Sequence, residues 1–238
     1  MLRTIKLGEA DRIVTFLTQG HGKVRAVAKG IRKTTSKFGA RLEPTSRVAV
    51  QCYRGRELDI VTQVETLEAN RALREEYALL IHAVPMLEAV DQVAQEREPN
   101  PALYRMLTGA LRTLAHRRTP IVTPAFFWKL CSLEGFHPML DACARCGTPA
   151  PDDAAAQDPR ALVAFDLDEG GTLCRSCARG GGRPCSPAAL ALLDRILGGG
   201  LNGVLAEAPG PAVHEVEQLG IRALEYHVER RLRSTALL

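Results

Sequence analysis

Residues 12–31 read RIVTFLTQGHGKVRAVAKGI, and this stretch decides how the first part of the chain is expected to fold. Two segments rich in β-branched residues, 12–18 and 23–31, flank the glycine-containing turn at 19–22, a pattern typical of strands. From residue 23 onward, Val24, Ala26 and Ala28 alternate with residues that are mostly basic. The stretch therefore predicts strands that bury one face and expose lysine and arginine on the other.

Two further strands are predicted in the same part of the chain. The segments 46–53 and 58–64 are short and rich in β-branched residues, and turn signals precede each of them. Several short strands with one apolar face favour a small closed or nearly closed barrel. Residues 2–6 are too few and too polar to predict a full first strand, so the barrel is expected to begin abruptly.

From residue 66 onward the apolar residues follow helical spacing. Helices are predicted at 67–80, 81–93, 101–116, 120–135, 187–197 and 212–233. Pro101 and Pro120 suit first-turn positions, and Ser186 is expected to cap the helix that starts at Pro187. Residues 95–101 are expected to link two helices, whereas the segment between the fourth and fifth helices is rich in Cys, Gly, Asp and Pro and is expected to form an insertion.

Four of the seven cysteines form two Cys-x-x-Cys pairs, CARC at 143–146 and CRSC at 174–177. Each pair can chelate one edge of the tetrahedron that zinc prefers, and Gly147 helps the backbone turn around the metal. Disulfides or redox-active pairs are the alternatives. A reducing environment argues against disulfides, and neither pair stands between a strand and a helix as a redox motif would. We therefore predict one structural zinc per chain, bound by Cys143, Cys146, Cys174 and Cys177.

The remaining candidate ligands are weaker. His137 lies six residues before the first pair, and Cys185 follows the glycine-rich end of the insertion. Cys52 and Cys131 lie in apolar stretches and are expected to be buried as small hydrophobic residues. Four thiolates leave no open coordination position for water, so the metal is expected to support the fold rather than catalyse a reaction.

The charge of the chain is unevenly distributed. Residues 1–66 hold 13 Lys+Arg against 6 Asp+Glu, whereas the other 172 residues hold 18 against 21. The window from Arg12 to Leu42 contains eight lysines and arginines and no acidic residue. Such asymmetry fits either a solvated basic surface or a site for a polyanion, and charge alone does not decide between them.

The chain carries no convincing catalytic motif. The sequence GGGLNG at 198–203 follows a predicted helix instead of a strand, and GHGK at 20–23 lacks the Ser or Thr and the upstream glycine of a phosphate-binding loop. No combination of serine, histidine and acid stands out, so we expect that the protein is not an enzyme. The chain also lacks a run of eighteen apolar residues and an apolar signal segment, which predicts no membrane partner and a cytoplasmic location.

The stretch LGEADRIVTFLTQGHGKVRAVAKGIRKTTSKFGARLEP at 7–44, together with LDIVTQVET at 58–66, resembles the N-terminal domain of the bacterial RecO family of DNA repair proteins. The segments GFHPMLDACARCG at 135–147 and CRSC resemble the zinc-binding insertion of that family. The resemblance covers nearly the whole chain. In one place the chain departs from it, because family members carry a longer stretch before residue 2 that supplies the first barrel strand.

The resemblance implies an α+β protein, with an N-terminal OB-fold β-barrel followed by an all-helical domain that contains an inserted four-cysteine zinc module. The expected boundaries are 1–66 for the OB-fold, 67–137 and 184–238 for the helical domain, and 138–183 for the zinc module. On this basis the basic residues that contact DNA phosphates are expected to be Lys23, Arg25, Lys29, Arg32, Lys33, Lys37 and Arg41.

The family also implies a function and partners. Its members bind single- and double-stranded DNA, anneal complementary strands and help to load RecA onto DNA coated by single-stranded-DNA-binding protein, in the RecF recombination pathway. The implied protein partners are RecR and the acidic C-terminal tail of single-stranded-DNA-binding protein. The alternatives are an RNA-binding OB-fold protein and an adaptor that does not bind DNA.

Overall fold

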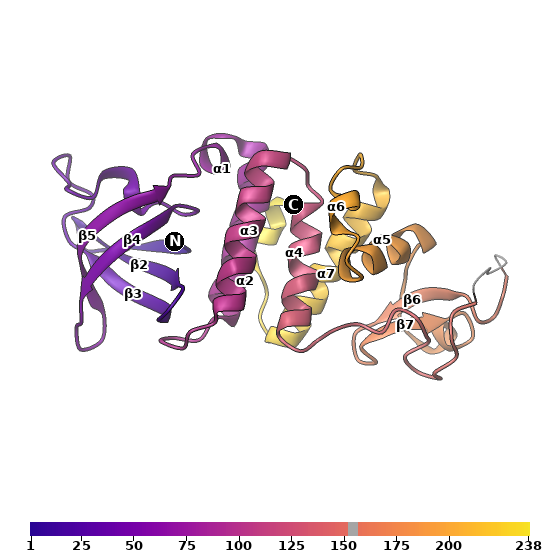
Figure 1. The fold of residues 1–238 in the computed structure, drawn as a ribbon. Coiled ribbons are helices and arrows are strands. Elements are labelled where there is room, and N and C mark those ends of the chain that lie inside the picture. Colours follow the sequence, from indigo (N-terminus) through magenta and orange to yellow (C-terminus); the bar gives the residue numbers. More distant parts are fainter. Residues whose placement is uncertain (152–156) are drawn as a thin grey trace. The chain divides into compact units, whose positions relative to one another are not determined.

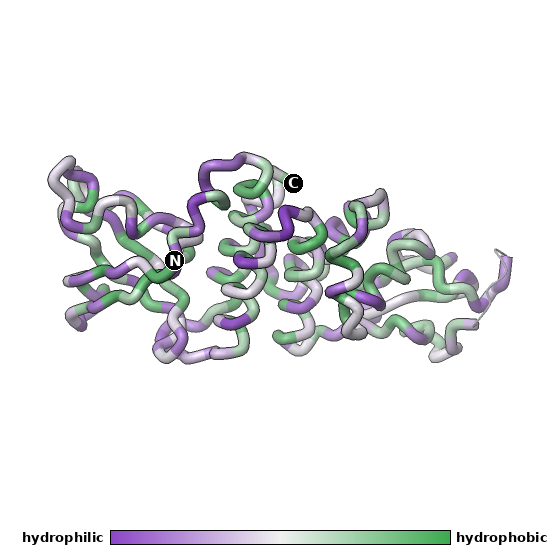
Figure 2. The backbone as a smooth tube through the Cα atoms, turned by 45° about the horizontal axis from the view of Figure 1, so that its top comes forward, coloured by the Kyte–Doolittle hydropathy of each residue, from purple (hydrophilic) through white to green (hydrophobic). Residues whose placement is uncertain are grey.

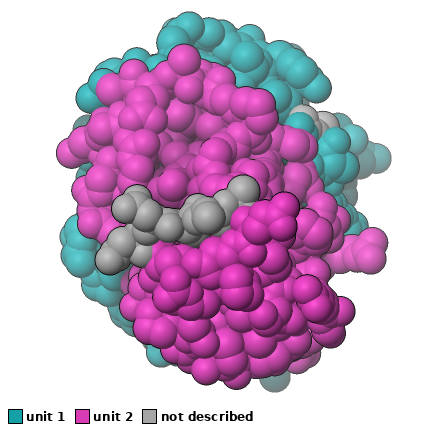
Figure 3. Space-filling view, turned by 90° about the vertical axis from the view of Figure 1, so that its right-hand side faces the viewer, with its two compact units in different colours: residues 1–118, 232–238 teal, residues 119–231 magenta. Residues whose placement is uncertain are grey.

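The computed structural model describes residues 1–151 and 157–238, which divide into two compact units (Figure 3). Unit 1 comprises Met1–Arg118 together with Leu232–Leu238, and unit 2 comprises Thr119–Arg231. The four-part division predicted from the sequence stays a prediction, and residues 152–156 of the predicted zinc module lie outside the described residues.

Unit 1 contains a five-stranded sheet in the order β1-β2-β3-β5-β4 (Figure 1). The strands are β1 (Arg3–Leu7), β2 (Asp11–Thr18), β3 (Gly22–Ala28), β4 (Arg47–Tyr53) and β5 (Asp59–Glu68). The β3–β5 pair is parallel, and the other neighbouring strands are antiparallel. This OB-like sheet confirms the predicted fold class. Within the described parts of the chain β1 and β4 do not pair, so the sheet is not closed; of the two predicted forms, a closed or a nearly closed barrel, the closed one is wrong.

The first strand was missed by the sequence patterns. β1 pairs antiparallel with β2 over five positions, from Arg3 opposite Thr15 to Leu7 opposite Asp11. Four of its five residues are exposed, so it lacks the apolar alternation that identifies a half-buried strand. Met1 lies beside the residues that precede β4: its amino group donates a 2.7 Å hydrogen bond to the Ser46 carbonyl.

The alternation predicted for β3 is confirmed. Every second residue from Gly22 to Ala28 is buried, and hydrophobic and hydrophilic residues follow one another at short intervals along the strands (Figure 2). Ala26 and Ala28 of β3 form the core of the sheet with Phe16 of β2, Val61 of β5 and two residues of the loop after β3, Phe38 and Leu42. The loop is therefore attached to the sheet by apolar contacts.

The helical part of unit 1 contains η1 (Gly39–Leu42), α1 (Ala72–Glu75), α2 (Tyr77–Val93), α3 (Pro101–Arg117) and η3 (Arg233–Leu237). The break between the first two helices falls at Glu76, whose backbone is extended, and not at residue 80. The Asn100 side chain accepts a 2.9 Å hydrogen bond from the backbone of Leu103 and caps α3. Glu88 of α2 accepts hydrogen bonds from the backbone of Arg233 and Ser234, which attaches η3 to α2.

The segment between α2 and α3 links the two helices, as the sequence predicted, but it is not free of other contacts. Its backbone pairs with the beginning of β3, because the Lys23 N–H donates to Gln95 O and the Arg97 N–H donates to Lys23 O. Gly22 has a left-handed backbone with φ of +64°, and a β-carbon there would lie 2.2 Å from the Glu98 carbonyl oxygen. The close approach of the two backbones requires glycine at this position.

Unit 2 contains the helices α4 (Val122–Leu133), α5 (Pro187–Leu197), α6 (Leu201–Val204) and α7 (Pro211–Val228). Between α4 and α5 lie β6 (Leu162–Asp166), β7 (Gly171–Cys174), η2 (Cys177–Gly180) and β8 (Arg183–Pro184), and the three strands form a sheet in the order β7-β6-β8. The Trp128 indole of α4 donates a 3.0 Å hydrogen bond to Val216 O of α7 and joins the two helices.

Two helix predictions in unit 2 differ from the structure. α7 ends at Val228, earlier than predicted, because Glu229 adopts a left-handed conformation with φ of 52°. The short helix α6 occupies part of the glycine-rich sequence interpreted as a loop. Across the described portion of the chain, no helix has the length and apolarity needed to cross a lipid bilayer.

Candidate metal centre and nucleic-acid surface

The four cysteines predicted as metal ligands lie together in unit 2. The sulfur atoms of Cys143, Cys146, Cys174 and Cys177 all lie within 4.8 Å of one another. Three elements supply them: the turn that begins at Cys143, the end of β7 and the start of η2. The structure therefore brings the four predicted ligands together, although the cysteine pairs are far apart in the sequence.

Backbone hydrogen bonds shape the first cysteine pair into a tight turn. The Gly147 N–H donates to Cys143 O at 2.8 Å, and Gly147 has φ of +71°, which agrees with the role predicted for this glycine. The Ala144 N–H donates to Thr172 O at 2.7 Å and joins this turn to β7. The weaker ligand candidates are not members of the cluster, and His137 Nδ1 instead lies 3.0 Å from the Ser132 hydroxyl.

The thiols of the cluster differ in acidity. Burial opposes ionisation of Cys143, but backbone N–H groups of Cys174, Cys146 and Arg145 outweigh it and lower the Cys143 pKa to about 6. A hydrogen bond with the Thr148 hydroxyl lowers the pKa of Cys146. The neighbouring sulfur atoms of Cys146 and Cys174 raise the pKa of Cys177 to about 12.

These opposed pKa shifts reflect the crowding of four ionisable sulfur atoms. Four sulfur atoms this close repel one another when ionised, so protons remain on part of the set unless a cation is present. A divalent cation among the four sulfur atoms supplies that charge, and thiolate is the ligand that zinc accepts in a closed tetrahedral site. The donor set therefore fits a structural metal. Cysteine sulfur atoms would occupy all four coordination positions of that metal and leave none for water.

The basic residues predicted to bind DNA fall into two groups in unit 1. Lys23 and Arg25 of β3 face carboxylates: the Lys23 ammonium lies 3.8 Å from Asp91 Oδ1 and donates a 2.7 Å hydrogen bond to Asp91 O, and Arg25 lies 3.7 Å from Glu96. The Lys23 side chain is 14% exposed, so most of it is removed from solvent. Lys23 therefore supports the contact of β3 with the end of α2, and Arg25 supports its contact with the segment after α2.

The other five residues are exposed and surround the loop after β3. Among the residues that the structure describes, these five make no ion pair with an acidic side chain: Lys29, Arg32, Lys33, Lys37 and Arg41. We call them the basic loop cluster. Their backbone is held in place, since Gly30 N–H donates to Asp11 Oδ1 at 2.7 Å and Arg32 N–H donates to Ala10 O at 3.0 Å.

Aromatic side chains contribute little to this surface. Phe38 lies inside the basic window but is only 2% exposed, because it packs into the core of the sheet. Tyr53 at the end of β4 is 69% exposed, and Arg54 and Arg56 follow it in an exposed turn. These two arginines lie outside the predicted DNA-binding set, although they form an RGR motif within the turn signal at 54–57.

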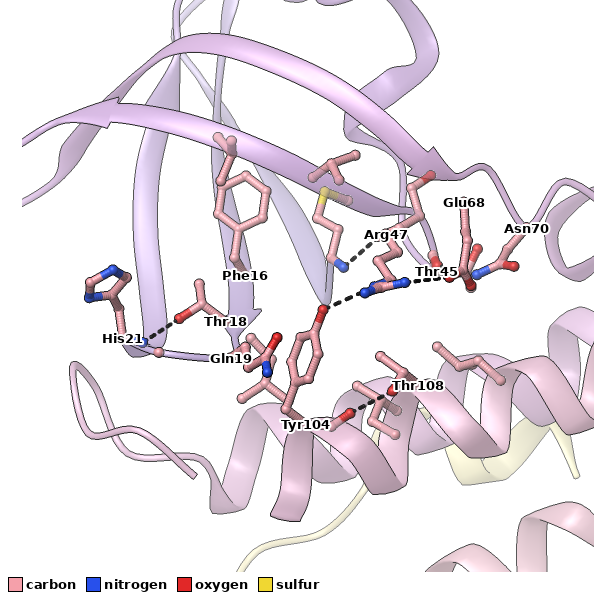
Figure 4. Close-up of a pocket in the computed structure, with 18 residues that line it drawn as sticks. Phe16, Thr18, Gln19, His21, Thr45, Arg47, Glu68, Asn70, Tyr104 and Thr108 are labelled. Carbon is pink, nitrogen blue, oxygen red and sulfur yellow. Dashed lines mark hydrogen bonds and ion pairs between the residues drawn. The ribbon is translucent and has the colours of Figure 1, made fainter. Parts of the chain in front are cut away.

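Unit 1 also contains a cavity of about 300 Å³ between the sheet and α3. Figure 4 shows Arg47 between Tyr104 and Glu68 on its wall. Hydrogen bonds from Arg112 and Arg47 hold the pKa of Glu68 at about 2, and the hydrogen bond with Tyr104 raises the pKa of Arg47. These polar groups already have partners in the protein, so the cavity wall is an internal network.

The geometry defines a class of protein with an OB-like sheet, a basic loop beside it, and a helical region that carries a four-cysteine metal site. Residues 1–70 match the family described as Recombination protein O N terminal, and residues 74–236 match the family described as Recombination protein O C terminal. The chain therefore belongs to the recombination protein O (RecO) family. It is a recombination and repair protein of a family of mediators that generally lack catalytic activity.

Proposed function

We propose that this chain binds single- and double-stranded DNA through the basic loop cluster and anneals complementary strands. The observation that carries the proposal is the contrast between the two groups of cations. Lys23 and Arg25 face acidic side chains of unit 1, whereas the five residues of the basic loop cluster are exposed and face no carboxylate among the described residues. Exposed lysine and arginine side chains on an ordered loop can contact successive phosphates of a nucleic-acid backbone.

The physical properties of this surface favour backbone contacts over base recognition. Phe38 is buried and Tyr53 is the nearest exposed aromatic residue of the sheet, so base stacking contributes little. Binding of this kind depends on counterion release, tolerates both single and double strands, and falls steeply with salt. Neutralised phosphates on two strands repel each other less, and their unstacked bases remain available for pairing.

The proposed partners follow from membership of the RecO family. We propose that the chain acts with RecR in the RecF pathway and binds the acidic C-terminal tail of single-stranded-DNA-binding protein. Through these contacts it would help RecA to assemble on coated DNA. In this role the protein performs no covalent chemistry.

The test is annealing of complementary DNA strands that have been coated with single-stranded-DNA-binding protein, with and without RecR. We expect the chain to accelerate annealing of DNA, and we expect a variant with alanine at Arg32, Lys33 and Lys37 to lose most of that acceleration. Equal or faster annealing of RNA would instead favour an RNA-binding protein. Capture of the acidic tail without any affinity for DNA would favour an adaptor.

We also propose that the four-cysteine cluster holds one structural zinc. The support is the sulfur geometry, since the four sulfur atoms all lie within 4.8 Å of one another. Metal analysis of the purified protein should find about one zinc per chain, and Cys174→Ser should remove it and destabilise unit 2. A folded wild-type protein without bound metal would contradict this assignment.

A further inference from the structure

Arg145 lies inside the first cysteine pair and connects it to two other parts of the metal module. Its Nη1 donates a 3.0 Å hydrogen bond to the Cys177 carbonyl oxygen, which belongs to the second pair. Its Nε donates a 2.9 Å hydrogen bond to Glu169, and its Nη2 lies 3.3 Å from Asp166 Oδ2. The backbone of Arg145 therefore belongs to the first cysteine pair. Its guanidinium group contacts the second pair, the end of β6 and the turn that follows β6.

The residues around the guanidinium leave room for it. A β-carbon at Gly180 would lie 3.3 Å from Arg145 Nη1, and one at Gly181 would lie 3.7 Å from Nη2. Arg145 thus passes over the end of η2, the helical turn that begins with Cys177. The side chain is 33% exposed, so its contacts are partly shielded from solvent.

We propose that Arg145 is a positioning residue of the metal site, which holds the two cysteine pairs in the arrangement that the metal requires. This inference rests on the proposed metal occupancy. A metal that must draw two mobile turns together binds less tightly than one that enters a preformed set of ligands, because the ordering of the ligands opposes binding. Arg145 supplies that order through a contact with the backbone of one ligand, while its own backbone lies between two others.

The geometry of the guanidinium, rather than its charge, carries this role. Arg145 faces two carboxylates, Asp166 and Glu169, so its positive charge is balanced locally. A planar group with several N–H donors is needed to reach three acceptors in different directions, and an ammonium group does not reproduce that arrangement. Arg145→Lys, which keeps the charge, is therefore expected to behave like Arg145→Met.

The experiment measures metal affinity of the full-length chain by competition with a chelator, using Zn²⁺, and records the thiolate charge-transfer absorption with Co²⁺. Arg145→Met and Arg145→Lys are each expected to weaken metal binding about 10- to 100-fold. Glu169→Ala, which removes the acceptor of the Arg145 Nε–H and leaves the arginine in place, is expected to give an intermediate loss. Arg160→Met is the matched control, because Arg160 is an exposed arginine of the same module that bonds only to Asp158 within the described residues.

The outcomes separate this inference from the metal assignment. Metal affinities of both Arg145 variants within about twofold of the wild type would overturn the positioning role and leave the metal site intact. Absence of metal binding by the wild type would overturn the metal site itself. A loss in Arg160→Met equal to that in Arg145→Lys would show a general effect of removing an arginine and would also overturn the role. If Arg145→Met does not fold, Arg145→Lys and Glu169→Ala decide the question.

Discussion

Replacing Glu217 by glutamine removes a carboxyl group that is buried in unit 2 at a cost to the fold. Glu217 lies on α7 and is 6% exposed. Its Oε1 has no hydrogen-bond partner among the described residues, and its Oε2 lies 3.8 Å from His214 Nδ1. Burial raises the Glu217 pKa from its ordinary 4.5 to about 7, because the charged form is poorly solvated.

The sign of the effect on stability follows from the direction of this pKa change. The folded protein holds the Glu217 proton more tightly than the unfolded chain does, so ionisation favours unfolding. Below pH 4.5 the ionisation of Glu217 does not affect the free energy of unfolding. It lowers this free energy increasingly as the pH rises from 4.5 to about 7, and the loss stays constant above that range. At about 1.4 kcal/mol for each pKa unit, the full loss amounts to at most about 3.5 kcal/mol.

Glu217→Gln should therefore raise the free energy of unfolding by up to about 3.5 kcal/mol at pH 8 and by little at pH 4.5. Urea unfolding followed by tryptophan fluorescence suits the measurement, because Trp128 is the only tryptophan and bonds to the backbone of Val216 next to Glu217. Asp194→Asn, an exposed carboxyl on α5, is the matched control and should change stability little at either pH. An equal effect of Glu217→Gln at both pH values would refute the reasoning.

Two predictions concern unit 1. Hydrogen bonds from Arg112 and then Arg47 keep the pKa of Glu68 at about 2, so its stabilisation is present above pH 4.5 and is lost as the pH falls toward about 2. In thermal unfolding, Glu68→Gln should lower the free energy of unfolding by about 1–2 kcal/mol at pH 7 and by less at pH 3. The control Glu65→Gln, at an exposed position, should not lower it. An equal loss for Glu68→Gln at both pH values would contradict this prediction. Gly22→Ala should cost about 2 kcal/mol or more in urea unfolding, because a β-carbon would meet the Glu98 backbone. Gly20→Ala, which meets no atom within 4 Å, should cost far less, and similar losses for both would argue against the close approach.

Local patterns in the sequence were sufficient for several parts of the fold. The helix predicted at 187–197 is found over Pro187–Leu197, and Ser186 caps it through a hydrogen bond from Ala189 N–H. The four cysteines that cluster could be picked out because the spacing within each Cys-x-x-Cys pair is itself the signal. In these cases the evidence lies within a few residues of the feature.

Features that depend on residues far apart in the chain could not be predicted from local sequence patterns. The alternation of β3 places Lys23 on the basic face of the strand. The Lys23 side chain is nevertheless mostly removed from solvent, because it lies beside Asp91 of α2, far along the chain. β1 was missed because it is exposed, and its pairing with β2 is what makes it a strand. The role of Arg145 likewise depends on Cys177 and Glu169, which only the folded module brings close to it.

The salt dependence of DNA binding tests the central claim most directly. The affinity of the wild-type chain for a single-stranded oligonucleotide should fall steeply between about 50 and 200 mM salt, and alanine at Arg32, Lys33 and Lys37 should reduce the slope of log affinity against log salt by up to about 3. A control with alanine at three exposed arginines elsewhere in unit 1, Arg71, Arg105 and Arg117, removes the same charge. Our account predicts a flatter slope for the loop variant and a nearly unchanged slope for the control. A loop variant with the wild-type slope, or a control with an equal loss, would contradict it.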